Sequence, residues 1–144
     1  MKREIATEIE IRASADQVWN ILTDLTRYNE WNGFLPKIKG ILEVTSKVCF
    51  VFNLPPFRAP ACAKVLVVEP KKTLRWAGGI PGLLRAEHYH ILESTSDSSV
   101  RFRHGEIFTG ILVPLMWYLF LSRNGPPVYE NVNHALKQRA ENTH

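Results

Sequence analysis

The sequence predicts one α+β domain, spanning residues 1–144, in which a long C-terminal helix covers an antiparallel sheet of about six or seven strands. Three observations predict it. Apolar and polar residues alternate over residues 4–12 and over much of residues 36–109, as in strands with one buried face. Helical apolar spacing fills most of residues 111–144. Each apolar sheet face needs a cover, and only this last segment is long enough to provide it.

The first strand is predicted over residues 5–11, where isoleucine and threonine alternate mainly with charged residues. Ser14 and Gln17 then fit a capping box, in which the serine caps a helix and the glutamine reaches back. Apolar residues at helical spacing over 18–25 predict a short helix. Asp24 could cap a second one. The sequence therefore predicts two short helices directly after the first strand.

The rest of the sheet is predicted from alternating segments separated by turn residues. Glycine and proline mark these turns, as in the loop at 78–82. The polar turn at 94–98 indicates that the last two strands form a hairpin. The predicted strands cover residues 36–43, 48–53, 61–69, 73–77, 84–93 and 99–109.

Residues 124–127, Asn-Gly-Pro-Pro, predict an interruption of the C-terminal helix, because proline lacks a backbone donor and clashes with the preceding turn. Two loops contain apolar side chains, Leu54 and Phe57 in one and Ile80 and Leu83 in the other. We expect these side chains to fold back onto the domain. The alternative is transient contact with a membrane or contact with a protein partner. A helix break close to these loops would make a gate for a ligand.

The composition is that of a globular protein, with 45% apolar and 22% charged residues. Basic residues outnumber acidic ones by 18 to 14, which gives a net charge of +4. The basic residues are scattered, and Arg101 and Arg103 alternate with apolar residues along a predicted strand. This pattern indicates a solvated sheet face and argues against a nucleic-acid partner.

The compartment is predicted from the apolar runs, the N-terminus and the cysteines. The most apolar run, residues 111–121, is too short to span a bilayer and contains Pro114. The N-terminus runs directly into a strand pattern, which predicts no signal peptide. Cys49 and Cys62 show no metal-ligand spacing. We therefore predict a cytoplasmic protein with no transmembrane segment and with both thiols reduced.

Short motifs along the whole chain resemble one superfamily. They are residues 9–11 and 13–19, Leu22, Asp24, Tyr28, Trp31 and Asn32, and residues 74–76, 88–90, 106–110 and 133–137. In this order they resemble the START-like (SRPBCC) superfamily of birch-pollen-allergen-type, polyketide cyclase/dehydrase and lipid-transport-like domains. The resemblance implies a helix-grip fold, in which a curved sheet wraps around the long C-terminal helix and leaves a hydrophobic cavity. We expect no cofactor.

The resemblance also implies which side chains line that cavity. Arg101 and Arg103 favour a wet outer face, so the residues between and beyond them are the better inward candidates. The alternative for any single aromatic side chain is that it fills an ordinary core. The predicted ligand-binding set is Trp31, Phe34, Phe50, Phe52, Trp76, His88, His90, Phe102, His104, Glu106, Phe108, Trp117 and Tyr129.

The polar members of this set define the site most sharply. A hairpin centred on residue 96 places His88 opposite His104 and brings Glu106 to the same face. Such a cluster is either a hydrogen-bonded network within the core or a polar anchor for a carbonyl or hydroxyl group of a ligand. His104 and Glu106 are the candidate acid–base pair of an enzyme. Zinc bound by His88, His104 and Glu106 is chemically possible, but the spacing matches no metal signature, so we predict no metal.

Three functions follow from these patterns. The first is a non-enzymatic carrier of a small apolar molecule, such as a lipid, an isoprenoid or an aromatic or polyketide-like metabolite. The second is a cyclase-, dehydratase- or hydrolase-like enzyme that uses His104 and Glu106. The third is an adaptor that binds a protein partner through its apolar loops, although the sequence does not indicate which protein.

Overall fold

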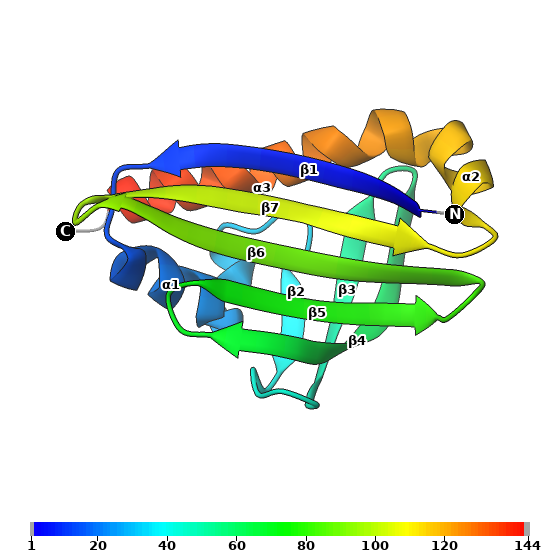
Figure 1. Ribbon diagram of the computed structural model, residues 1–144, viewed down its shortest axis with the longest axis horizontal. Coiled ribbons are helices and arrows are strands. Elements are labelled where there is room, and N and C mark those ends of the chain that lie inside the picture. Colours follow the sequence, from blue (N-terminus) through cyan, green and yellow to red (C-terminus); the bar gives the residue numbers. More distant parts are fainter. Residues whose placement is uncertain (1, 143–144) are drawn as a thin grey trace.

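A computed structural model describes residues 2–142, which form one curved antiparallel sheet and a set of helices (Figure 1). Within these residues the sheet has seven strands in the order β1-β7-β6-β5-β4-β3-β2. The prediction of an α+β helix-grip fold is therefore confirmed, while Met1 and residues 143–144 lie outside the described chain. The strands are β1 (Lys2–Ile11), β2 (Lys37–Gly40), β3 (Lys47–Leu54), β4 (Phe57–Glu69), β5 (Thr73–Ile80), β6 (Leu84–Ser96) and β7 (Ser99–Thr109).

The sheet bends around the C-terminal helical segment. That segment comprises α2 (Val113–Met116), a π-helical turn η2 (Trp117–Leu121) and the long helix α3 (Ser122–Glu141). In Figure 1, β1 and β7 run along the helix, whereas β3 stands at a steep angle to them. The pairing of β4 with β5 shifts register between Val65 and Val67, and such a bulge bends a strand. The concave face thus turns toward α3.

The two short helices follow β1 as predicted, namely α1 (Ala15–Thr23) and the 3-10 helix η1 (Leu25–Glu30). The capping box of α1 is confirmed: the Gln17 backbone N–H donates to Ser14 Oγ at 3.2 Å, and the Ser14 N–H donates to Gln17 Oε1 at 2.9 Å. Asp24 stands at the start of η1, but its carboxylate accepts a hydrogen bond from the Thr26 hydroxyl and does not cap the helix.

The β6–β7 hairpin is confirmed, but its predicted register is two residues off. Glu106 and not His104 lies opposite His88, and His104 lies opposite His90. The reason is the turn, because Ser96 already pairs with Ser99 and the ladder shifts between residues 94 and 96. A two-residue shift keeps every side chain on its predicted face, since side chains alternate along a strand.

The predicted interruption at residues 124–127 is wrong, because the helix continues through both prolines. The π-helical turn ends at Leu121, one helical turn before the prolines, and such a turn is where a helix absorbs a local disruption. Tertiary contacts explain why asparagine and glycine stand at positions 124 and 125. A Cβ atom at Gly125 would collide with the Ile5 side chain, and Asn124 Nδ2 donates a hydrogen bond to the Pro55 carbonyl at 2.9 Å. Residues 124 and 125 therefore bring the helix into contact with β1 and with the β3–β4 turn.

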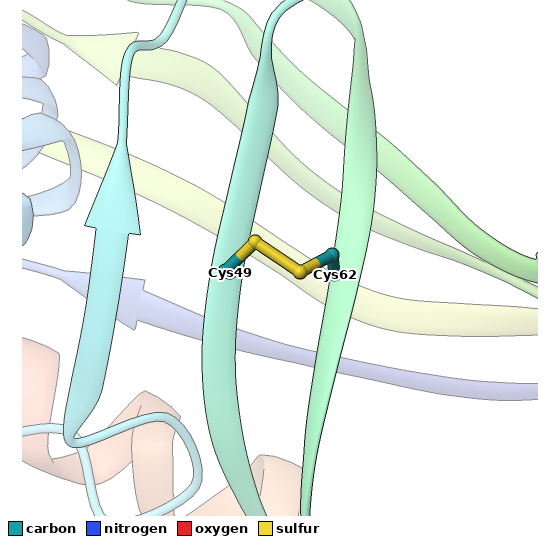
Figure 2. Close-up of a disulfide and its surroundings, with 2 residues drawn as sticks. All are labelled: Cys49 and Cys62. Carbon is teal, nitrogen blue, oxygen red and sulfur yellow. A yellow bond between two sulfur atoms is a disulfide. The ribbon is translucent and has the colours of Figure 1, made fainter.

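The prediction of two reduced thiols is also wrong, because Cys49 and Cys62 form a disulfide (Figure 2). The two residues are direct partners on β3 and β4, with Cα atoms 4.1 Å apart. Disulfides persist mainly in oxidising compartments, so the cysteines no longer support a cytoplasmic location. Among the described residues, no helix combines the length and the hydropathy needed to cross a membrane.

Candidate ligand cavity

A cavity of about 460 Å³ lies between the concave face of the sheet and the C-terminal helical segment. This size is typical of small-molecule sites. The structure places eight of the thirteen predicted side chains in its wall, namely Phe34, Phe50, Phe52, Trp76, His88, Glu106, Phe108 and Tyr129. They come from β3, β5, β6, β7, α3 and the segment before β2.

Small residues create the space. Ala61, Ala63, Gly78 and Ala86 lie in the wall on the adjacent strands β4, β5 and β6. Gly78 pairs directly with Ala86, and Ala61 pairs with Phe50. Larger side chains there would fill the cavity. Sequence reasoning missed these residues: Ala61 and Ala63 alternate on a predicted strand, but their position beside Gly78 and Ala86 depends on which strands are neighbours.

Helical residues complete the wall. Met116, Phe120 and Leu121 from α2 and η2 line the cavity together with Leu54 at the end of β3 and Phe57 at the start of β4. The Phe57 and Phe120 rings contact each other edge to face, with centroids 4.9 Å apart. The sequence did not reveal the helical residues of the wall, because helical spacing alone does not show which face of the helix meets the sheet. Leu54 and Phe57 were identified only as apolar loop residues.

The other five predicted residues lie outside the wall. Phe102, His90 and His104 are buried farther along β6 and β7, where α3 packs directly onto the sheet. Trp31 packs against Tyr28 on η1. The fifth, Trp117, lies in the π-helical turn.

A chain of buried hydrogen bonds runs behind the cavity. Asn133 Nδ2 donates to Thr7 Oγ1 at 2.8 Å, so its Oδ1 faces His104 Nδ1 at 2.9 Å and accepts the proton on that nitrogen. His104 Nε2 is then an acceptor for His88 Nε2–H, at 2.7 Å. This order leaves His88 Nδ1 as an acceptor facing Glu106 Oε1 at 3.7 Å. The network fixes one tautomer for each of these two histidines.

The cluster keeps its histidines neutral. Burial lowers the pKa of His88 and of His90 well below 6.5, and the neighbouring histidines lower them further. Burial also lowers the pKa of His104 to about 4, although its hydrogen bond to Asn133 opposes the shift. Charging any one of them would place an unsolvated cation beside two other rings.

Glu106 is the residue of the cavity wall that can change its protonation state near neutral pH. Its side chain is 13% exposed, and its Oε1 accepts a hydrogen bond from the Tyr129 hydroxyl. Burial raises the pKa of Glu106 to about 7, while that hydrogen bond lowers it. Burial and the Glu106 charge raise the pKa of Tyr129 well above 10. The carboxyl group can therefore donate or accept a proton near neutral pH.

His88, His90 and His104 bring ligand nitrogens within 4.8 Å of one another. Their rings, however, stack nearly in parallel, at 16° to 28° between planes. A tetrahedral metal site needs lone pairs that converge from different directions, and the facing nitrogens of His88 and His104 already bond to each other. The geometry fits a hydrogen-bonded stack better than a metal site.

The curved sheet, the long C-terminal helix and the cavity between them are those of a helix-grip fold. The chain belongs to the family described as "Polyketide cyclase / dehydrase and lipid transport", whose model matches residues 2–141. The predicted START-like membership is thereby confirmed. A search of curated protein sequences gave no significant match.

Solved structures share the fold at low sequence identity. A START superfamily protein from Mycobacterium smegmatis has a TM-score of 0.76 at 15% identity, covering 96% of this chain and 97% of that one. A norcoclaurine synthase point mutant from Thalictrum flavum has a TM-score of 0.73 at 15% identity, covering 97% and 94%. The Zhui aromatase/cyclase from a Streptomyces species has a TM-score of 0.71 at 13% identity, covering 98% and 94%. These likenesses establish the fold alone.

Proposed function

We propose that this protein binds one small, largely apolar molecule that carries a polar group. The observation that carries this proposal is the distribution of polarity in the cavity. Aromatic and aliphatic side chains form most of the wall, and the polar side chains His88, Glu106 and Tyr129 meet at one place. A pocket of this kind holds an apolar body by burial and orients it through a few polar contacts.

The wall favours a ligand with an aromatic or isoprenoid body. Phe34, Phe50, Phe52 and Phe108 present rings to the cavity, and rings stack well on flat apolar groups. Protonated Glu106 can donate a hydrogen bond to a carbonyl group, and the ionised form can accept one from a hydroxyl group. The expected ligand is therefore a ketone, phenol or alcohol of aromatic, polyketide-like or isoprenoid type.

A fluorescent apolar probe, N-phenyl-1-naphthylamine, tests the binding site. We expect saturable binding to the wild type and a loss of about tenfold or more in Ala86→Leu, because the added side chain fills part of the cavity. Ala6→Leu is the matched control, since Ala6 is exposed on β1. Equal binding by both variants would place the probe outside the cavity and contradict the proposal.

A second function, acid–base catalysis on the bound molecule, is favoured by one observation. Glu106 faces the cavity with a pKa of about 7, beside Tyr129 and His88. The acid–base pair in this proposal is Glu106 and Tyr129, because His104 lies outside the wall and its Nε2 is already engaged. Two of the similar structures are a synthase and an aromatase/cyclase by name. Glu106→Gln should abolish turnover in an enzyme, whereas a carrier should lose only part of its affinity.

A further inference from the structure

Exposed apolar side chains gather at one end of the molecule. Among the described residues, seven of the nine large exposed apolar side chains belong to this group, and the other two, Ile41 and Val44, lie between β2 and β3. The seven are 37% to 81% exposed. We call them the end patch: Phe57, Ile80, Ile111, Leu112, Leu115, Tyr118 and Leu119.

Hydrogen bonds and ring contacts hold the parts of the end patch together. The Ile111 N–H donates to the Gly82 carbonyl at 3.0 Å, which ties the start of the helical segment to the β5–β6 turn. Phe57 of β4 contacts Phe120 of η2. In Figure 1, α2 and the β5–β6 turn lie at the same end of the molecule, on the right. The end patch is therefore one surface built from three segments that are distant in sequence.

The cavity reaches this surface through residues that both line it and belong to the segments of the end patch. Phe57 is half exposed and also lines the cavity, as do Gly79, Leu84, Met116 and Phe120 from the same three segments. An apolar molecule that enters the cavity between these residues must come from water unless an apolar partner covers the end patch. With such a partner, the molecule stays in an apolar environment throughout.

The three segments that build the end patch carry only positive charges. Residues 53–60, 78–85 and 107–128 contain no aspartate or glutamate. Lys2, Arg58 and Arg123 are exposed there, and none forms an ion pair with another described residue. Lys2 pairs with Thr109, next to the start of the helical segment, and Arg58 follows Phe57 directly.

We propose that the end patch docks onto a membrane surface that contains anionic phospholipids. Aromatic and aliphatic side chains would enter the interface, and the surrounding lysine and arginine side chains would contact the negative headgroups. Docking places the cavity opening against the lipid, so an apolar ligand passes between membrane and cavity without exposure to water. The complementary charge favours this occupant over a second copy of the chain, whose end patch carries the same positive rim.

Flotation with lipid vesicles tests the docking. The protein should float with vesicles of phosphatidylcholine and phosphatidylserine, bind pure phosphatidylcholine more weakly, and lose binding as salt is raised. The double variant Ile111→Ser, Leu115→Ser should lose about tenfold in vesicle binding. The matched control is Ile41→Ser, Val44→Ser, which removes equally exposed side chains elsewhere and should bind like the wild type.

A second pair of variants tests the charge. Arg58→Glu should weaken binding to anionic vesicles, whereas Lys39→Glu on β2 should not. No flotation of the wild type, or equal flotation of the end-patch and control variants, would overturn the proposal. So would a dimer that the end-patch variant abolishes while vesicle binding persists. Docking does not require a bound ligand, so Ala86→Leu should still float with the vesicles. Failure of the proposed ligand binding would appear in the probe titration and would leave the flotation result unchanged.

Discussion

The two ends of the space between sheet and helix differ in how they are filled. At the closed end, Phe102, His104 and Leu136 are fully buried, and the hydrogen bonds of Asn133 on α3 join the helix to His104 and Thr7 of the sheet. At the open end, small residues on β4 to β6 leave a cavity, and apolar side chains remain exposed. One sheet and one helix thus make both a packed core and a cavity. The choice between them depends on side-chain volume along the strands.

Truncation of one phenylalanine at each end tests this difference most strongly. Phe102→Ala removes a fully buried ring and should cost about 3–5 kcal/mol in the free energy of unfolding. Phe52→Ala, in the cavity wall, should cost only about 1 kcal/mol, because its ring already faces empty space. Urea unfolding of both variants measures the two values. Equal costs would mean that the cavity wall is packed as tightly as the closed end.

The open end is held in part by a covalent link. The disulfide between Cys49 and Cys62 joins β3 and β4, which both contribute side chains to the cavity wall, across a sequence separation of 13. Reduction should therefore lower the free energy of unfolding by about 3 kcal/mol, since it frees the unfolded chain. Urea unfolding with and without reductant measures this. The stability of the double variant Cys49→Ala, Cys62→Ala should not change with reductant. A change would show that the reductant acts on something other than the disulfide.

The closed end depends on satisfied polar groups. Asn133→Leu leaves the Nδ1–H group of His104 without its acceptor, which should cost about 1–3 kcal/mol. The control, Asn20→Leu, changes an exposed residue of α1 and should be nearly neutral. Probe affinity should be the same in both variants, because Asn133 lies outside the cavity wall. A selective loss of affinity in Asn133→Leu would mean that the two ends are coupled.

The pH dependence of stability has opposite signs at the two ends. The pKa of His104 falls from 6.5 to about 4, so its stabilising contribution is present above pH 6.5 and is lost as the pH falls toward 4. Each buried histidine contributes up to about 1.4 kcal/mol per pH unit. The pKa of Glu106 rises from 4.5 to about 7, so its contribution is present below pH 4.5 and is lost as the pH rises through 7.

Chemical unfolding at a series of pH values separates these contributions. His90→Phe should reduce the loss of stability on acidification, because one buried histidine no longer takes up a proton on unfolding. Glu106→Gln should instead flatten the profile between pH 4.5 and 7. Parallel profiles for wild type and His90→Phe would show that the pKa of this histidine is the same in the folded and unfolded protein, and would contradict the account.

Local patterns predicted the fold and the faces of the strands well. Alternation assigned His104 and Glu106 to one face, and the predicted hairpin added His88 to it, because a register shift of two residues leaves every side chain on its face. The sequence predicted less well which residues along a strand line the cavity and which lie in the packed core. Phe102 and Phe108 share a face, yet only Phe108 reaches the cavity, because the path of α3 over the sheet decides where packing ends. No local pattern encodes that path.

The wrong predictions share a tertiary cause. The disulfide depends on the register of β3 against β4, which brings Cys49 opposite Cys62. Gly125 resembles a helix breaker in the sequence, but it allows the helix to approach Ile5 closely. The small residues of β4 to β6 indicate a cavity only when their strands are known to be neighbours.

Native mass spectrometry of the purified protein, with extraction of what it carries, tests the central claim that the open end is a ligand site. We predict one small apolar molecule per chain on the wild type and on Ala6→Leu, and its loss from Ala86→Leu, where the cavity is filled. A bound molecule that Ala86→Leu retains in full would contradict the claim and place the ligand outside the cavity.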